Sequence, residues 1–545
     1  MNPLTQCRWL SLSALVLGAA ACSTAPPPPP EAEYGQPVVV EGPLPYLGVH
    51  GLGVDPAGRL LAGSVVGQSL SLVDRETGSV SPFVAPPVGM ADDVAFGPDG
   101  EIAWTAYLVG ELRIRNAAGE IRTVASGLPG LNSLAYTDDG RLFATQVFMG
   151  DALYEIDRRG EQPPRKIIEG MGGLNGFEFG PDGYLYGPLW FKGKVVRVNV
   201  DSGEMETVAD GFQIPAAVNF DGQGRLYVVD TATGELLRVT PGRAEKVRVA
   251  QLSPSLDNLA IDKKAGLIYV SNMADNSIQE VDLADGRVRD LVRTRLAAPS
   301  GLAMVGDELH IADTFAYRVM DTGSGEIREV GRMWASHLEY PLNAWADQNV
   351  VVLTSWATGT VQVFDRASGE MTHGFHDFKA PHDAVQLADG SLLVAELGSG
   401  SLVRVSGEQG EQREAVVVAL AGPAGMAFNG DRSSLFVTTA GGSVWAVNPT
   451  DWSKRRVRDG LAVPEGISVS AAGKLLVMEV GKQRLLEIDP VDGATRTLAK
   501  GLPVGLPALD GLPPTGVFND VVEAANGDLF FTADRDAGLY RLPRR

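Results

Sequence analysis

The sequence predicts an all-β fold made of two tandem six-bladed β-propellers, and three observations lead to this class. A unit of about 41 residues recurs about twelve times from Tyr46 to the C-terminus. Each unit reads as four short strands joined by Gly-containing turns, with apolar and polar residues alternating in its second and third strands. No helical period separates the units. Because a propeller blade is a four-stranded sheet of this length, we expect about twelve blades.

The repeat is clearest in three consecutive copies. They are LNSLAYTDDGRLFATQ from Leu131, LNGFEFGPDGYLYGPLW from Leu174 and PAAVNFDGQGRLYVVD from Pro215. In each copy an apolar strand is followed by a Gly-containing turn and then by an alternating strand. The Gly of such a turn supplies the positive φ that a tight hairpin requires. The remaining copies begin near His50, Asp92, Asp257, Ser300, Leu342, His382, Ala424, Glu465 and Asn519.

The way the rings could close predicts the domain boundary. The last copy ends with GLYRLPRR, its third strand, while an extra strand at 36–41 precedes the first copy. A propeller commonly closes by taking a strand from the other end of the ring. We therefore expect 36–41 to complete the blade at 257–282, which leaves 287–292 to complete the C-terminal blade. The predicted propellers are 36–285 and 286–545, because a split into seven and five blades offers no such pair of spare strands.

Length and charge limit the class of protein further. A chain of 545 residues is long enough for two domains of about 250 residues. Hydrophobic residues make up 44% of it, which is typical of a globular protein with a large core. The 46 Lys and Arg residues and 67 Asp and Glu residues give a net charge of −21. This charge repels phosphate backbones, so we expect no nucleic acid partner.

The N-terminal residues predict export. Residues 1–21 combine Arg8, a short apolar stretch and small residues before Cys22, and the segment resembles a bacterial lipoprotein signal peptide. The resemblance implies that Cys22 becomes the lipidated N-terminus and that Cys7 is removed, which leaves no cysteine pair for a disulfide. The alternative is an ordinary signal peptide cut near the same place. Residues 22–35, with five consecutive prolines, predict a stiff spacer.

The lipid anchor predicts where the protein resides. We expect an exported protein held in the cell envelope by its lipid, and Ser23 rather than Asp after the lipidated cysteine favours the outer membrane. The sequence contains no later stretch of about 18 apolar residues, so it predicts no membrane-spanning helix.

Candidate functional residues lie at the mouth of each central tunnel. The residue that enters the first strand of a blade and the residue that leaves the second, about 14 positions later, meet on one face of the ring. Asn at these points also caps turns, which is the structural alternative. Six polar residues at such positions are candidates for ligand binding: His50, Asn132, Asn175, Asp230, Asp257 and Asp313.

The second ring is predicted to be the more reactive one. His382 and Glu396 are its candidate catalytic pair, and Glu465, Glu479 and Asn519 are its candidate metal ligands. Carboxylates that share one mouth repel each other, which raises their pKa values or requires a cation. Oxygen ligands with one imidazole suit Ca²⁺ or Mg²⁺. The alternative is that these side chains are merely solvated.

Two families share these motifs. The segment GVFNDVVEAANGDLFFTAD from Gly516 resembles the gluconolactonase and regucalcin-like propellers, which implies that Asn519 binds a divalent metal. The segments PHDAVQLADGSLLVAELGSGSLVRV from Pro381 and PEGISVSAAGKLLVMEVGKQRLLEIDP from Pro464 resemble virginiamycin B lyase-type repeats. That resemblance implies that His382 and Glu396 surround Mg²⁺ and serve lactone ring opening by elimination.

Two functions are compatible with this sequence. The first is an envelope protein whose propeller faces bind a small-molecule or protein ligand, and this interpretation is preferred because neither family's catalytic set is complete. The alternative is a divalent-metal-dependent lactonase, esterase or lyase with its site at the mouth of the second propeller. Whether the protein is an enzyme stays open at this point.

Overall fold

The computed structural model describes residues 33–243, 245–507, 509 and 516–545, and over these residues the regular secondary structure is almost entirely β. Three 3-10 helices, η1 (Pro98–Gly100), η2 (Tyr107–Val109) and η3 (Val480–Lys482), are single turns. A search of the described residues finds no helix long and apolar enough to cross a membrane. The predicted signal peptide and Cys22 lie outside the described residues.

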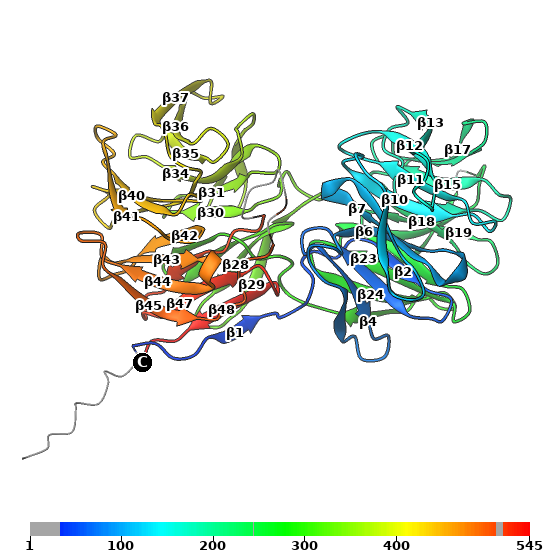
Figure 1. Ribbon diagram of the computed structural model, residues 1–545, viewed down its shortest axis with the longest axis horizontal. Helices are drawn as coiled ribbons and strands as arrows, with labels where there is room; N and C mark the ends of the chain where they lie inside the picture. Colours follow the sequence, from blue (N-terminus) through cyan, green and yellow to red (C-terminus); the bar gives the residue numbers. More distant parts are fainter. Residues whose placement is uncertain (1–32, 244, 508, 510–515) are drawn as a thin grey trace, which may run out of the picture.

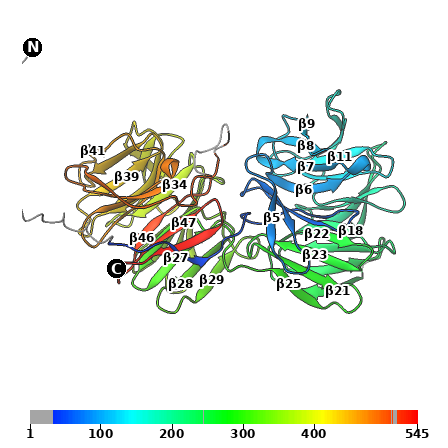
Figure 2. The same ribbon diagram turned by 60° about the horizontal axis from the view of Figure 1, so that its bottom comes forward.

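Twelve four-stranded antiparallel sheets form two rings that lie side by side (Figures 1 and 2), which confirms the predicted fold class. The sheets of the first ring are β2–β5 (52–84), β6–β9 (91–125), β10–β13 (131–169), β14–β17 (178–210), β18–β21 (215–251) and β22–β25 (256–292). The sheets of the second ring are β26–β29 (302–332), β30–β33 (343–375), β34–β37 (381–417), β38–β41 (423–458), β42–β45 (464–500) and β46–β48 (521–542) together with β1 (Val38–Glu41).

The rings close differently from the predicted exchange. Strand β1 pairs with β48 (Gly538–Leu542), and the two run together in Figure 1, blue beside red. The extra N-terminal strand thus completes the last blade of the second ring. Strand β25 (Val288–Val292) stays in its own sheet beside β24 (Ser277–Asp282). The prediction that 36–41 closes the first ring, with a boundary at residue 285, is therefore wrong.

A short hairpin explains why β25 is not exchanged. The Asp282 amide donates to the Arg287 carbonyl at 3.0 Å, and Gly286 has a φ of 73° in the turn between the two strands. Closing so short a loop costs little conformational entropy. Among the described blades only the last one lacks a fourth strand from consecutive sequence, so the pairing of β1 with β48 completes both rings. The first ring then ends at Val292, and residues 293–301 connect it to the second.

Apolar packing between neighbouring sheets closes each ring. Leu52 of the first blade packs against Tyr269 of the sixth blade in the first ring. In the second ring Leu302 packs against Phe530, and Val40 of β1 lies against the same cluster. A fully buried side chain of this size contributes about 1.5–3 kcal/mol, so these contacts stabilise the closed form of each ring.

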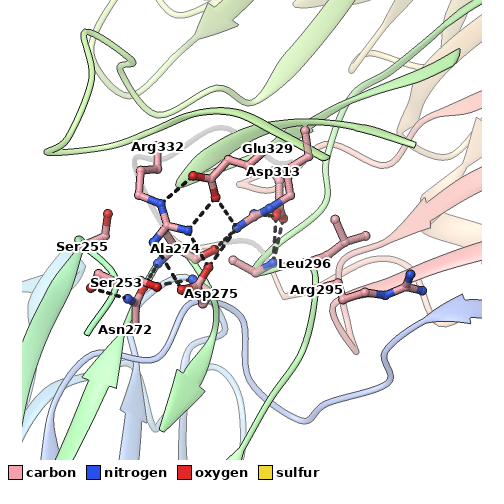
Figure 3. Close-up of polar contacts among 12 residues, drawn as sticks. Ser253, Ser255, Asn272, Ala274, Asp275, Arg295, Leu296, Asp313, Glu329 and Arg332 are labelled. Carbon is pink, nitrogen blue, oxygen red and sulfur yellow. Dashed lines mark hydrogen bonds and ion pairs between the residues drawn. The ribbon is translucent and has the colours of Figure 1, made fainter. Parts of the chain in front are cut away.

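A polar seam joins the two rings, and Figure 3 shows it. Arg332, the last residue of β29 (Ile327–Arg332), donates to the Pro254 carbonyl at 2.8 Å and to the two Asp275 carboxylate oxygens at 3.2 and 2.9 Å. Arg318 donates to the Ala274 carbonyl at 2.7 Å. Both arginines belong to the second ring, and their acceptors belong to the first.

Further contacts position these arginines. Glu329 accepts from Arg332 at 2.6 and 2.7 Å and from Arg318 at 3.3 Å, and buried Asp313 also pairs with Arg318. The hydroxyl of Ser255 donates to the Met333 carbonyl at 2.6 Å, again across the seam. Because these groups satisfy one another, the two rings are held in one relative orientation at this edge.

Candidate functional site

The mouth of the first tunnel is ringed by one entry residue from each blade. In several blades a β-bulge interrupts the first strand at this point, as between Ala91 and Val94, and turns the entry residue out of the strand ladder. The six entry residues are His50, Asp92, Asn132, Asn175, Ala216 and Asp257.

Two of these residues are carboxylic acids without a basic partner. Asp92 and Asp257 are both partly exposed at the mouth. Burial raises the pKa of Asp92 well above its ordinary value, and the neighbouring charge of Asp257 raises it further. Burial also raises the pKa of Asp257. Among the charges of the described residues that act on the two carboxyls there is no Lys or Arg, so their charge is uncompensated.

His50 adds an imidazole to the same mouth. Its Nδ1 lies 2.8 Å from the Gly48 carbonyl, and because a carbonyl can only accept, Nδ1 carries the proton. Burial lowers the pKa of His50 to about 4, so the ring is neutral at pH 7 and Nε2 has its lone pair free. The ring lies edge-on to Phe315 of the second ring, with centroids 5.7 Å apart.

Asn132 and Asn175 complete the polar part of the mouth. Their side chains are 5% and 6% exposed. The Ser133 hydroxyl donates to Oδ1 of both, at 2.8 and 3.2 Å, and the Gly176 amide donates to Oδ1 of Asn175 at 2.9 Å. No acceptor from the described residues is within hydrogen-bonding distance of either Nδ2 group. Both amides therefore keep a free donor.

A loop of the second ring covers this mouth. It runs over 333–342, between β29 and β30 (Asn343–Ala346). Burial raises the pKa of Tyr340 in this loop, and the charges of Asp257 and Asp92 raise it further, so its phenol lies beside the two acids. Burial and the same Asp92 raise the pKa of Tyr107, which belongs to the first ring. The site is thus built by both propellers.

Aromatic side chains form the outer edge of the same region. Trp334 of the covering loop contacts Trp190 with ring centroids 5.2 Å apart and stacks on Phe148 at 6.5 Å. Phe148 also contacts Phe191 at 5.5 Å. Phe148 and Phe191 remain 45% and 57% exposed, and the adjacent Met149 is 55% exposed. Large apolar side chains exposed together beside a polar mouth are typical of a binding surface.

The corresponding mouth of the second ring is sealed. Its entry residues are Ser300, Leu342, His382, Ala424, Glu465 and Asn519, and each of these residues is at most 5% exposed. Glu465 accepts from the Asn519 amide at 2.6 Å and from its Nδ2 at 2.8 Å. Burial lowers the pKa of His382 to about 4, and its ring packs against Phe518 with centroids 6.2 Å apart. Glu465 and Asn519 therefore satisfy each other, whereas the buried Nε2 of His382 has no hydrogen-bond partner among the described residues.

The exit residues serve the backbone of their own blades. Asp230 accepts from the Gln213 and Ile214 amides at 2.8 and 3.1 Å, and Asp313 accepts from two loop amides in the same manner. These two predicted ligand-binding residues fasten the loop that leads into the first strand. A carboxylate bound by backbone amides in this manner is held away from the tunnel.

Glu396 and Glu479 likewise accept hydrogen bonds from backbone amides in the second ring. Glu396 accepts from the Lys379 amide at 3.0 Å and from the Ser399 hydroxyl at 2.6 Å. Glu479 accepts from the Ala462 amide at 2.8 Å and pairs with Arg484. Burial alone would raise the pKa of Glu479, but these contacts outweigh it and hold the pKa below its ordinary value.

The structure therefore brings together only two of the predicted metal ligands, Glu465 and Asn519. Of the five residues expected to converge, Glu465 and Asn519 bind each other, His382 is enclosed, and the two exit glutamates are engaged elsewhere. Among the residues that the structure describes, no group of three or more His, Cys, Asp or Glu side chains is arranged to hold a metal ion. The Ca²⁺ or Mg²⁺ site stays a prediction without support from this geometry.

The first tunnel also opens on the opposite face of the ring. A cavity of about 550 Å³ lies there, lined by Asp93 and Asn258 at its tunnel end and by charged residues outside. Asn258 donates to Asp93 at 3.1 Å, and Lys263 pairs with Glu178 at 2.7 Å. The outer charges compensate each other, but Asp93 at the tunnel end has no basic partner among the described residues, and burial raises its pKa to about 7.

Sequence reasoning found part of this site and missed the rest. It placed His50, Asn132, Asn175 and Asp257 at the first mouth, where they lie. Asp92 also occupies an entry position, but it is not one of the candidate ligand-binding residues of the sequence analysis. An Asp at this position indicates a candidate as strongly as the Asp at position 257 does. Tyr107, Tyr340 and Trp334 were missed. The only signal for the last two is a pair of aromatic residues in a loop that is longer than most of its counterparts, for example 376–380.

These features define the class: the chain is a tandem six-bladed β-propeller protein. Its N-terminal strand completes the last blade, and a loop of the second ring covers the polar mouth of the first. No family model matches the chain, and no curated protein matches it either.

Solved structures of similar shape include virginiamycin B lyase from Staphylococcus aureus, with 15% identity over 51% of this chain and 96% of that chain and a TM-score of 0.37. A catalytically inactive form of that enzyme with quinupristin gives 16% identity over the same shares, also with a TM-score of 0.37. The extracellular domain of a one component system from B. thetaiotaomicron gives 10% identity over 90% of this chain and 75% of that chain, with a TM-score of 0.32. At these identities and scores the comparisons do not bear on activity.

Proposed function

We propose that this protein is an exported, lipid-anchored envelope protein that binds a small ligand at the covered mouth of its first propeller. One observation carries the proposal. The same six entry positions leave Asp92 and Asp257 partly exposed and uncompensated in the first ring, whereas the second ring seals its own. Acids that folding partly desolvates without a basic partner are costly to the fold, and such acids cluster at functional sites.

The second propeller has a different part in this proposal. It supplies Tyr340 and Trp334 of the covering loop, and the contacts of Arg332 across the seam hold that loop over the mouth. Binding energy then comes from both rings, which is common for pockets between domains. The alternative function, a metal-dependent lactonase or lyase in the second ring, would need His382 and Glu396 to meet at an open site.

Fluorescence and thermal stability of the full chain test the ligand site. A library of cationic, neutral and anionic small molecules, with Ca²⁺ and Mg²⁺ included, is screened for a rise in melting temperature. Molecules that raise the melting temperature should also perturb tryptophan fluorescence. The rise in melting temperature should be lost in Trp334→Ala and kept in Trp445→Ala, the matched control in β40 (Ser443–Val447) of the second ring. Hits that all survive Trp334→Ala, or a library without hits, would contradict the proposed site.

The anchor is tested separately. Cys22→Ser should move the protein from the membrane fraction to the soluble fraction of the envelope, and palmitate should label only the wild type. If the variant still sediments with membranes and the wild type takes up no label, the lipid anchor is wrong, and the ligand site is unaffected by that result.

A further inference from the structure

The charge at the first mouth favours a cationic ligand. Asp92 and Asp257 are two acids from different blades, and Asp93 adds a third nearby carboxyl whose charge acts on Asp92. None of the described Lys or Arg residues compensates the pair at the mouth. No three His, Cys, Asp or Glu side chains of the described chain are arranged as a metal site. An organic ammonium group, which needs acceptors but no fixed coordination geometry, suits these acids better than a metal ion.

Asn132 and Asn175 add an independent requirement. Both side chains are at least nine-tenths buried, both point their Oδ1 at protein donors, and both keep an Nδ2 group without an acceptor in the described part of the chain. Neither Nδ2 group is one of the fully buried unpaired atoms of the described chain, so both are open to the mouth, where each can donate to an acceptor oxygen on a ligand. The ligand therefore carries a carbonyl oxygen in addition to its cationic group.

The third requirement is apolar. Trp190, Trp334 and Phe148 form an aromatic cluster at the edge of the mouth, and Phe191 extends it into solvent. Trp334 has a φ of 67° and Tyr340 a φ of 38°, both in the left-handed region that non-glycine residues rarely adopt. The cluster offers a flat surface for a hydrophobic group of the ligand.

We infer that the covered mouth binds an α-ammonium amide with an apolar side chain, the chemistry of a peptide's N-terminal residue. The ammonium group lies between Asp92 and Asp257, the amide oxygen accepts from Asn132 and Asn175, and the apolar side chain packs on Trp334 and its neighbours. This inference rests on the proposed function, because it names the ligand class of the same site.

Three related probes test the inference on the full chain by calorimetric titration at pH 7.5. L-Phenylalaninamide has the ammonium, the carbonyl and the aromatic ring. N-Acetyl-L-phenylalaninamide lacks the charge, and 2-phenylethylamine lacks the carbonyl. We expect the first to bind at least about tenfold more tightly than either of the others, because each lost charge-assisted or buried hydrogen bond is worth about that factor.

Variants assign each part of the ligand. Asp257→Asn should weaken L-phenylalaninamide by at least about tenfold and leave the N-acetyl compound unchanged, since only the first has a charge to lose. Asn175→Leu should weaken the binding of L-phenylalaninamide toward the affinity of 2-phenylethylamine, because one of the two amide donors to its carbonyl oxygen is lost. Exposed Asp285→Asn is the control, and a melting temperature for each variant shows that it is folded.

The outcomes separate the inference from the proposed function. Equal binding of all three probes, lost in Trp334→Ala, would overturn the ammonium and carbonyl assignment while keeping the mouth as a ligand site. Ca²⁺ binding that Asp257→Asn abolishes would overturn the organic cation in favour of a metal. Binding of none of the probes would also overturn the inference, and the library screen at the same mouth would then decide the proposed function on its own.

Discussion

Arg332 donates to both carboxylate oxygens of Asp275, at 3.2 and 2.9 Å, and the two residues belong to different propellers. The arginine is the last residue of β29, and the covering loop with Trp334 and Tyr340 follows it directly. The pair thus fixes the loop that roofs the first mouth. A change at this pair should therefore alter the ligand site, although neither side chain lies at the mouth.

Arg332→Ala should make the covering loop more mobile. It removes three hydrogen bonds across the seam and leaves Asp275 without this partner, which we expect to lower the free energy of unfolding by about 1–3 kcal/mol. Tryptophan fluorescence should shift to longer wavelength as Trp334 becomes more exposed. Arg328→Ala is the control, because Arg328 lies on the same strand, is exposed and pairs with Glu308 inside its own ring. Equal effects of the two variants would show that the seam does not hold the roof.

Asp257→Asn should make the protein more stable than wild type at pH 8 but not at pH 4. A carboxyl whose pKa is raised by folding stabilises the fold while it is protonated, and this contribution is lost as the pH rises through the folded-state pKa. The amide never ionises, so the difference in unfolding free energy should grow in its favour by about 1–3 kcal/mol from about pH 4 to pH 8. Urea unfolding at several pH values measures it.

His50, Tyr107, Tyr340, Asp92 and Asp93 are the other titratable groups at this mouth, and all are common to wild type and variant. The comparison therefore reports on the Asp92–Asp257 pair, because the loss of the Asp257 charge also removes one cause of the raised pKa of Asp92. Exposed Asp285→Asn should show no such trend. A difference between Asp257→Asn and wild type that is flat across this pH range would mean that the acid is solvated and not buried at the mouth.

Removal of β1 should open the second ring and spare the first. A chain that begins at residue 42 loses the pairing of Val38 with Arg541 and of Val39 with Tyr540, which exposes the outer edge of the last blade. Hydrogen exchange followed by mass spectrometry should show faster exchange through 302–542 and little change in 52–292. Faster exchange confined to the first ring would instead support the strand exchange that the sequence suggested.

Glu479→Gln should destabilise the second ring whether or not a divalent cation is present. The glutamate binds the Ala462 amide and pairs with Arg484, so we expect a loss of about 1–3 kcal/mol at pH 7. The folded-state pKa is lowered, so the wild-type advantage is present above about pH 4.5 and disappears as the pH falls through the folded-state value. Exposed Glu408→Gln is the control. A loss that millimolar Mg²⁺ or Ca²⁺ creates, and that is absent without the cation, would restore the predicted metal site.

The sequence was sufficient for the blades but not for their closure. The repeat of Gly turns and alternating strands predicted the twelve sheets, because each blade is made of residues close in sequence. Closure depends on which remote edge receives residues 36–41, and two edges were compatible with the pattern. The tight turn at Gly286, which keeps β25 with β24, decided it.

The candidate site, too, could be predicted only in part from the sequence. The entry positions of His50, Asn132, Asn175 and Asp257 follow from the repeat, so their place at the mouth could be predicted. Whether a mouth is open or sealed depends on contacts between residues far apart in sequence, such as Phe518 against His382. The roles of the exit acids depend on which backbone amides lie within reach, and no spacing pattern reports that.

The position of β1 has a consequence for how this chain is made. The first ring is complete once Val292 has emerged during synthesis, because all of its strands are consecutive. The second ring needs β1, which is synthesised before any other described strand, and β48, which is synthesised after all the other described strands. Strand β1 must therefore stay unpaired while nearly the whole chain is produced, and the two propellers are expected to fold one after the other. A partner that shields this strand during synthesis and export would prevent it from pairing with a wrong edge.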